Sequence, residues 1–96
     1  MPREMIIVKN VNHPGQTARL DAVKYKAART AMLKVLPKKA PGMTQHEMMV
    51  AMRKALPTAQ FPGTTTSWWV KTVQLDLEAK GLVLRDGGKP LRWRRP

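Results

Sequence analysis

The chain has 96 residues, enough for one domain with a modest core and too few for two independent domains. Its 18 Lys and Arg residues against 6 Asp and Glu give a formal net charge of +12, which favours a polyanionic partner, nucleic acid above all, over a surface that is basic only for solubility. Cysteine is absent, which excludes disulfides and thiolate metal sites and agrees with a reducing, cytoplasmic location.

The N-terminal segment has the composition of a strand that ends in a tight turn. Residues 5–11 are rich in β-branched side chains, and Asn12-His13-Pro14-Gly15 is a dense turn signal. Residues 16–20 are a candidate return strand. The apolar run over 5–8 is too short for a signal peptide or a membrane span. We therefore expect residues 1–21 to form a β-strand or hairpin extension packed on the core.

The next segment predicts an amphipathic helix over 22–36. Asp21 is placed to cap it, and Tyr25, Ala28 and Met32 recur at helical spacing on one face. Pro37 ends this helix, and residues 37–42 form a short linker of breakers and charge.

A capping box marks the second helix. Thr44-Gln-His-Glu47 places a hydroxyl and a carboxylate three residues apart, so that each accepts a hydrogen bond from the other residue's backbone amide. The helix ends before Pro57. Its inward side is predicted to carry Met48, Met49, Met52, Ala55 and Leu56, because methionine at helical spacing is more often core than binding surface.

The third helix is predicted to run to Lys80. Residues 58–63 lead into it, with Phe61 folding back onto the core, and Thr65, Thr66 and Ser67 are all candidate caps. One side is predicted to carry Val70, Val73 and Leu77, with Trp69 at its edge; the opposite side is predicted to carry Trp68, Lys71, Thr72, Leu75 and Ala79. Asp76 and Glu78 are expected to flank that opposite side and to repel phosphates.

A basic β-hairpin is predicted after Gly81. Residues 82–85 have strand composition, 86–89 tolerate positive φ, and 91–94 alternate apolar and basic residues. Leu91 and Trp93 are expected to point inward. The outer surface would then carry five cations against the single acid Asp86, and these cations are Arg85, Lys89, Arg92, Arg94 and Arg95.

The segment Val73-Gln-Leu-Asp-Leu-Glu-Ala-Lys-Gly-Leu-Val-Leu-Arg85, with the order of elements before it, resembles the winged helix-turn-helix superfamily of bacterial transcription regulators. The resemblance covers about residues 22–95. It implies an α+β fold in which residues 22–96 form a three-helix core with a C-terminal hairpin, the wing. The runs Asn12-His-Pro-Gly, Asp21-Ala-Val-Lys-Tyr25 and Ser67-Trp-Trp-Val-Lys-Thr-Val also resemble a small group of uncharacterised bacterial proteins.

The same resemblance implies a DNA-binding surface and a regulator or accessory role. Its groove-facing helix positions fall on Ser67, Trp68, Lys71, Thr72 and Leu75, and its wing contacts fall on Arg85, Lys89 and Arg92. The basic side chains would contact phosphates, and these are Lys71, Arg85, Lys89, Arg92, Arg94 and Arg95.

Base readout would come from Ser67, Lys71 and Thr72. The alternative, which the sequence favours as much, is that Ser67 is a helix cap and Thr72 an ordinary solvated position. The second hypothesis is a winged helix that binds a protein or dimerises through Trp68 and Leu75, which together would make an apolar patch. RNA binding is a third and less favoured alternative.

Residues for catalysis are scarce. The two histidines, His13 and His46, lie in a turn and at a helix start, and no two acids fall three or four residues apart. We therefore expect no enzyme activity, no metal site, no cofactor, no small-molecule ligand and no membrane association.

Overall fold

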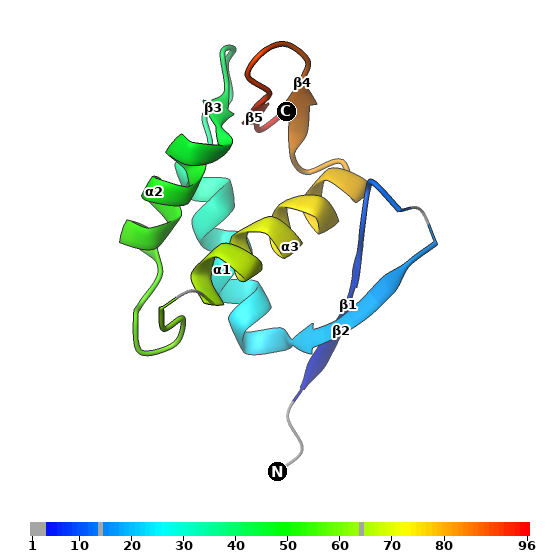
Figure 1. Ribbon diagram of the computed structural model, residues 1–96. Helices are drawn as coiled ribbons and strands as arrows, with labels where there is room; N and C mark the ends of the chain where they lie inside the picture. The colour runs from blue at the N-terminus through cyan, green and yellow to red at the C-terminus, as the bar shows by residue number, and fades with distance from the viewer. Residues whose placement is uncertain (1–3, 14, 64) are drawn as a thin grey trace.

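A computed structural model describes residues 4–13, 15–63 and 65–96. The elements in chain order are β1 (Met5–Lys9), β2 (Thr17–Asp21), α1 (Ala22–Val35), β3 (Met43–Thr44), α2 (Gln45–Ala55), α3 (Thr65–Ala79), β4 (Leu84–Asp86) and β5 (Arg92–Arg94) (Figure 1). The predicted α+β fold is confirmed, with three helices, an N-terminal hairpin and a C-terminal hairpin after α3. Residues 1–3 of the predicted extension and Pro14 of the predicted turn lie outside the described residues.

Both predicted helix caps on α1 and α2 are confirmed. Oδ1 of Asp21 accepts hydrogen bonds from the amides of Val23 at 2.9 Å and Lys24 at 3.1 Å. At α2, Thr44 Oγ1 accepts from the Glu47 amide at 3.1 Å, while Glu47 Oε1 accepts from the Thr44 amide at 2.9 Å. α3 begins at Thr65, and the residue before it lies outside the described residues, so the choice of cap among Thr65, Thr66 and Ser67 stays a prediction.

One core joins the three helices and both hairpins. The predicted inward residues Tyr25, Met32, Met48, Met52, Phe61, Trp69, Val70, Val73, Leu77 and Trp93 are all buried. Two predictions of burial are wrong. Leu91 is 41% exposed because it precedes β5 rather than lying within it, and Ala55, the last residue of α2, is also exposed.

The C-terminal sheet contains a strand that the sequence prediction missed. Its order is β3-β5-β4, and β3 pairs antiparallel with β5 through Met43↔Trp93 and Thr44↔Arg92. The predicted linker over 37–42 therefore leads into the sheet. Gly42 allows the close approach, because a Cβ atom at this position would lie 2.2 Å from the carbonyl oxygen of Trp93.

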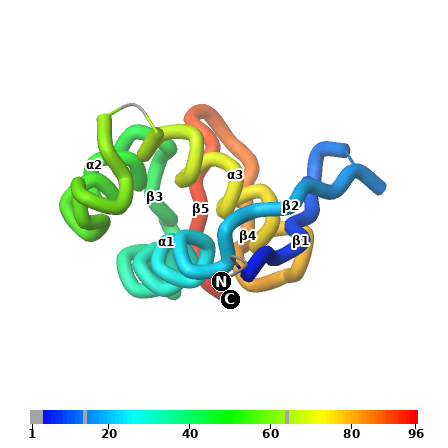
Figure 2. The backbone as a smooth tube through the Cα atoms, turned by 90° about the horizontal axis from the view of Figure 1, so that it is seen from below, coloured from blue at the N-terminus to red at the C-terminus, as the bar shows by residue number. Residues whose placement is uncertain are grey.

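The return strand predicted in the N-terminal segment is present. β1 and β2 pair antiparallel from Met5↔Asp21 to Lys9↔Thr17, and Val8 and Leu20 enter the core from this hairpin. The hairpin lies beside α3, at the opposite end of the molecule from α2 (Figure 2). No helix in the described part of the chain combines the length and the apolar character that crossing a bilayer requires.

Candidate nucleic-acid interface

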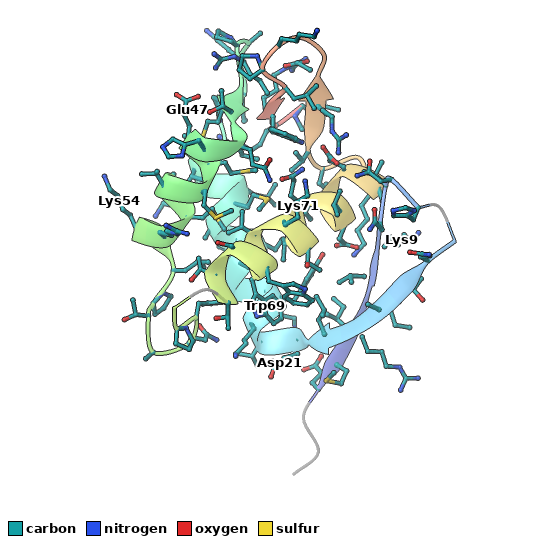
Figure 3. The ribbon with its side chains drawn as sticks, in the orientation of Figure 1. Lys9, Asp21, Glu47, Lys54, Trp69 and Lys71 are labelled. Carbon is teal, nitrogen blue, oxygen red and sulfur yellow. The ribbon has the colours of Figure 1, made fainter. Side chains whose placement is uncertain are left out.

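The outer face of α3 brings together the five side chains predicted for groove contact. Their positions span an arc of less than half a turn of the helix, and they are Ser67, Trp68, Lys71, Thr72 and Leu75. Trp68 and Lys71 are exposed, and the other three are half-buried. Figure 3 labels Lys71 on this helix. We call this surface the α3 face.

The N-terminal hairpin covers part of the α3 face. Thr72 and Leu75 line a small pocket of about 120 Å³ whose remaining walls come from β1, β2 and the turn beside them. Leu75 is therefore less accessible than the helical projection alone suggests, and the accessible apolar group of this face is Trp68, which is 52% exposed.

Arg53 of α2 adds a cation that the sequence prediction left out of the site. Its Nη2 donates a hydrogen bond of 3.3 Å to Ser67 Oγ, which places the guanidinium at the start of the α3 face. Neither Arg53 nor Lys71 forms an ion pair with a carboxylate among the residues that the structure describes. Arg53 was predictable as an exposed residue, but its approach to α3 depends on how the two helices pack.

The predicted acidic flanks of this face are wrong. Asp76 is completely buried, and the Glu78 side chain is only 5% exposed because it turns toward the wing. Both acids of α3 are thereby removed from its outer surface. The predicted repulsion of phosphates by these two residues does not apply.

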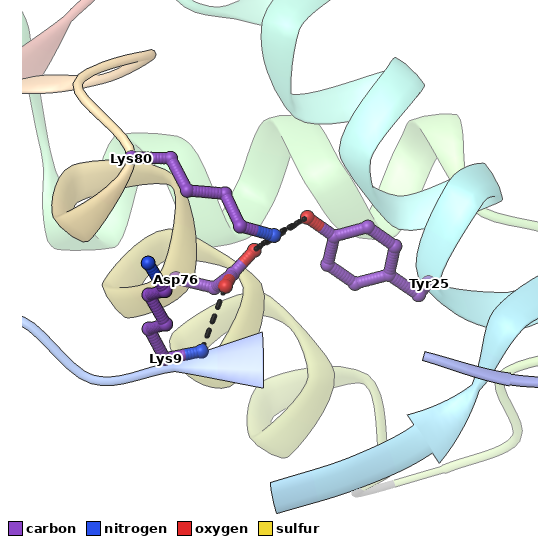
Figure 4. A network of polar contacts seen from close by, with 4 residues as sticks. All are labelled: Lys9, Tyr25, Asp76 and Lys80. Atoms are coloured by element: carbon purple, nitrogen blue, oxygen red, sulfur yellow. Dashed lines mark hydrogen bonds and ion pairs between the residues drawn. The ribbon is translucent and has the colours of Figure 1, made fainter. Parts of the chain in front are cut away.

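Asp76 is buried at the centre of a polar network that joins three elements (Figure 4). Its Oδ2 accepts hydrogen bonds from the Tyr25 hydroxyl of α1 and from Lys80 Nζ at 2.9 Å, and its Oδ1 accepts one from the Lys9 amide of β1 at 2.8 Å. Lys80 Nζ also donates to the Tyr25 oxygen at 3.2 Å. The network compensates the cost of burying a carboxylate and fastens the hairpin and α1 to α3.

The network around Asp76 shifts the pKa values of Tyr25 and Lys80. Burial raises the pKa of Tyr25, and the hydrogen bond to Asp76 raises it further. For Lys80, burial lowers the pKa, but the hydrogen bonds to Asp76 and Tyr25 outweigh it and the net shift is upward.

Glu78 holds the first of the wing arginines. Arg85 donates to it through Nε at 2.9 Å and Nη2 at 2.7 Å, a bidentate pair, and the indole N–H of Trp93 donates to the same carboxylate. The hydrogen bonds to Glu78 raise the pKa of Arg85 against the opposing effect of burial. The Arg85 guanidinium also lies over the Trp93 ring, 5.6 Å from its centroid.

The other three wing arginines also donate hydrogen bonds to oxygen atoms of the protein. Arg94 Nε lies 2.8 Å from Asp86 Oδ2, and Arg92 Nη1 lies 3.0 Å from the Gly42 carbonyl and 3.4 Å from Glu47 Oε1. Arg95 Nε donates to the carbonyl of Leu36 at 2.8 Å.

The prediction that one acid faces the wing is therefore wrong, because Glu47 and Glu78 face it as well. Arg85, Arg92 and Arg94 each have a carboxylate partner. Lys89 is exposed at the tip of the wing and has no ion pair within the described ranges.

Comparison with known proteins identifies the family. The model of a family of unknown function, DUF6958, matches residues 5–93, which include every helix and strand in whole or in part. No curated protein and no solved structure matches the chain. The chain belongs to the DUF6958 family.

Proposed function

We propose that this chain is a cytoplasmic winged helix-turn-helix protein that binds double-stranded DNA through the α3 face and acts as a transcription regulator or accessory factor. The observation that carries the proposal is that two cations at that face, Arg53 and Lys71, have no carboxylate partner among the described residues. Glu78, the acid on the same side of α3, is nearly buried and is neutralised by Arg85. Such a surface attracts phosphates without internal competition.

The distribution of acids supports a polyanionic partner more generally. Each of the six carboxylates has an internal partner, and they are Glu4 with Lys26, Asp21 with the start of α1, Glu47 with Thr44 and Arg92, Asp76 with Tyr25 and Lys80, Glu78 with Arg85, and Asp86 with Arg94. The 18 Lys and Arg residues outnumber these six carboxylates threefold, so most of the positive charge is not offset by an ion pair. Nucleic acid is the partner that releases counterions on meeting such a surface.

The residues divide into two roles in this proposal. Arg53, Lys71 and Lys89 contact phosphates, and Ser67 and Thr72 lie where side chains reach base edges. The wing arginines contribute less to affinity than their number suggests, because a guanidinium that moves to a phosphate must first leave its carboxylate.

The test is a titration of labelled duplex DNA at several salt concentrations. Wild type is expected to bind, with an affinity that falls by about 0.9 log units per log unit of salt for each phosphate contact. The double variant Arg53→Ala, Lys71→Ala should bind much more weakly and with a shallower salt slope. The matched control, Arg29→Ala with Lys34→Ala, removes one arginine and one lysine from α1, and neither has an ion pair among the described residues. α1 packs against the inward side of α3 (Figure 2). Equal losses in both variants, or no binding near physiological ionic strength, would contradict the proposal.

Protein interaction or homodimerisation through Trp68 and Leu75 is the second candidate. The exposure of Trp68 favours it, whereas the half-buried position of Leu75 beside the hairpin leaves only a small apolar patch. Sedimentation equilibrium of wild type and Trp68→Ala separates the two candidates, because only a dimer would show a mass that falls with the substitution. Duplex RNA in the same titration tests the third alternative.

A further inference from the structure

Trp68 differs from the other two tryptophans of the chain. It is 52% exposed, whereas Trp69 and Trp93 are 8% and 3% exposed. An exposed indole on a surface that the proposed function already assigns to DNA calls for a specific role, because large apolar side chains left in water mark interaction sites.

A chain of aromatic contacts supports the Trp68 ring. The Trp68 and Trp69 centroids lie 5.3 Å apart with the rings at 85°, and the Trp69 and Phe61 centroids lie 5.8 Å apart at 84°. Both contacts have the edge-to-face geometry that aromatic pairs prefer. Phe61 is 1% exposed, so the chain begins in the core and ends at the surface. Trp68 is thereby held in place before any ligand arrives, which lowers the entropy cost of binding.

The polar groups around Trp68 suit a nucleic acid. Ser67 precedes it in the chain and accepts the hydrogen bond from Arg53, and Lys71 follows one helical turn later. A flat aromatic ring beside cations that have no carboxylate partner among the described residues is the arrangement by which proteins hold bases and their phosphates together.

An intact duplex does not use such a ring well. In the major groove the base edges present hydrogen-bond donors, acceptors and the thymine methyl, and an indole offers a single N–H donor and no acceptor. The flat surfaces of the bases are covered by their neighbours in the stack. A base that has left the stack exposes its flat surface, and every type of base has one.

We propose that the α3 face recognises DNA that carries an unpaired base and that Trp68 stacks on this base. The proposal rests on the DNA-binding function above and names the class of substrate. Arg53 and Lys71 then hold the phosphates of the unpaired nucleotide and its neighbours, while Lys89 contacts the adjoining duplex.

The experiment compares a labelled perfect duplex with the same duplex carrying one bulged thymine. Wild type is expected to bind the bulged duplex roughly 5- to 150-fold more tightly, the range that stacking of one base on an aromatic side chain provides. Binding should also quench tryptophan fluorescence, since Trp68 is the accessible indole. Trp68→Ala should lose the preference and the quenching, so that it binds the two DNAs with similar affinity, and Trp68→Phe should retain part of the preference.

A matched control and three adverse outcomes complete the test. Val23→Ala removes another exposed apolar side chain, 62% exposed on α1, and should change neither affinity. Equal affinity for both DNAs overturns this inference and leaves the proposed function standing, whereas binding to neither DNA overturns both. A preference that persists in Trp68→Ala, in a variant whose thermal melting shows a folded chain, also overturns the inference.

Discussion

The wing has many cations, but most of them are paired with carboxylates, whereas the α3 face has few cations, and these are unpaired among the described residues. The wing has four arginines, three of which face a carboxylate: Glu78, Glu47 or Asp86. The α3 face has only Lys71 and the neighbouring Arg53, yet both acids of α3 are turned away from it. The partners of the charged residues, more than the number of these residues, therefore determine which surface offers positive charge to a polyanion.

Structural roles explain why the wing cations are occupied. Arg85 and Trp93 both donate to Glu78, which ties β4 and β5 to the end of α3. Arg92 bonds to the Gly42 carbonyl and so joins β5 to the segment before α2. These arginines stabilise the position of the hairpin, and their replacement would affect folding as well as binding.

The largest effect is expected from removing Asp76, the buried acid of α3. Asp76→Ala leaves Tyr25 and Lys80 without their acceptor and the Lys9 amide without its partner. We expect the free energy of unfolding to fall by about 3 kcal/mol. Urea denaturation followed by circular dichroism measures it. Asp86→Ala, which removes an acid from a more exposed ion pair, should cost less than about 1 kcal/mol and serves as the control. Similar losses in both variants would show that burial gives Asp76 no special role.

Removing one cation from the α3 face and one from the wing is expected to weaken duplex binding to different extents. Lys71→Ala should weaken duplex binding roughly eightfold at about 0.1 M salt, which is the contribution of one phosphate contact. Arg94→Ala should weaken it less than about twofold, because its charge is already offset by Asp86. Fluorescence anisotropy at matched salt measures both, and the reverse ranking would place the main contact surface on the wing.

A smaller effect on duplex affinity is expected when the wing arginine Arg92 loses its carboxylate partner. Glu47→Gln keeps the capping box, since glutamine also accepts from the Thr44 amide, but it removes the charge that faces Arg92. We expect duplex affinity to rise roughly threefold, less than the eightfold of a full contact because Arg92 stays bonded to Gly42. An unchanged affinity would mean that Arg92 lies outside the interface.

The smallest effect concerns pH. The hydrogen bond from the Thr44 backbone amide lowers the pKa of Glu47 below its usual value of 4.5. The Thr44 side chain and the charge of Arg92 lower this pKa further. A carboxylate whose folded-state pKa is lowered stabilises the fold above its unfolded value and loses that contribution as the pH falls through the folded value. The difference in melting temperature between wild type and Glu47→Gln should therefore shrink from neutral pH to well below 4.5. A difference that stays constant would contradict the pKa shift.

Local sequence signals predicted the parts of the fold that depend on neighbours in the chain. Asp21 and the Thr44-Glu47 box act over two or three residues, and both caps form as expected. The inward residues of α3 followed from helical spacing because Val70, Val73 and Leu77 are apolar. The order of helices and hairpins could be predicted for the same reason.

Interactions between distant segments account for the errors. The sequence prediction placed Asp76 at a flank of the outward side of α3, but the partners that bury it, Tyr25 and Lys9, lie 51 and 67 positions away. β3 has only two residues and forms through pairing with β5, a strand near the other end of the chain. The pairing of Arg85 with Glu78 depends on where the chain turns after α3, which composition alone does not give.

The bond from the Lys9 amide to Asp76 has a consequence for how the family can vary. The donor belongs to the main chain, so nineteen of the twenty amino acids at position 9 would provide it and only proline would not. The attachment of the hairpin to α3 at this point is specified by the acceptor and by the path of the strand. The outward side chains of β1 can consequently change without loss of this bond, while a residue at position 76 that has no side-chain acceptor would remove it whatever the sequence of the hairpin.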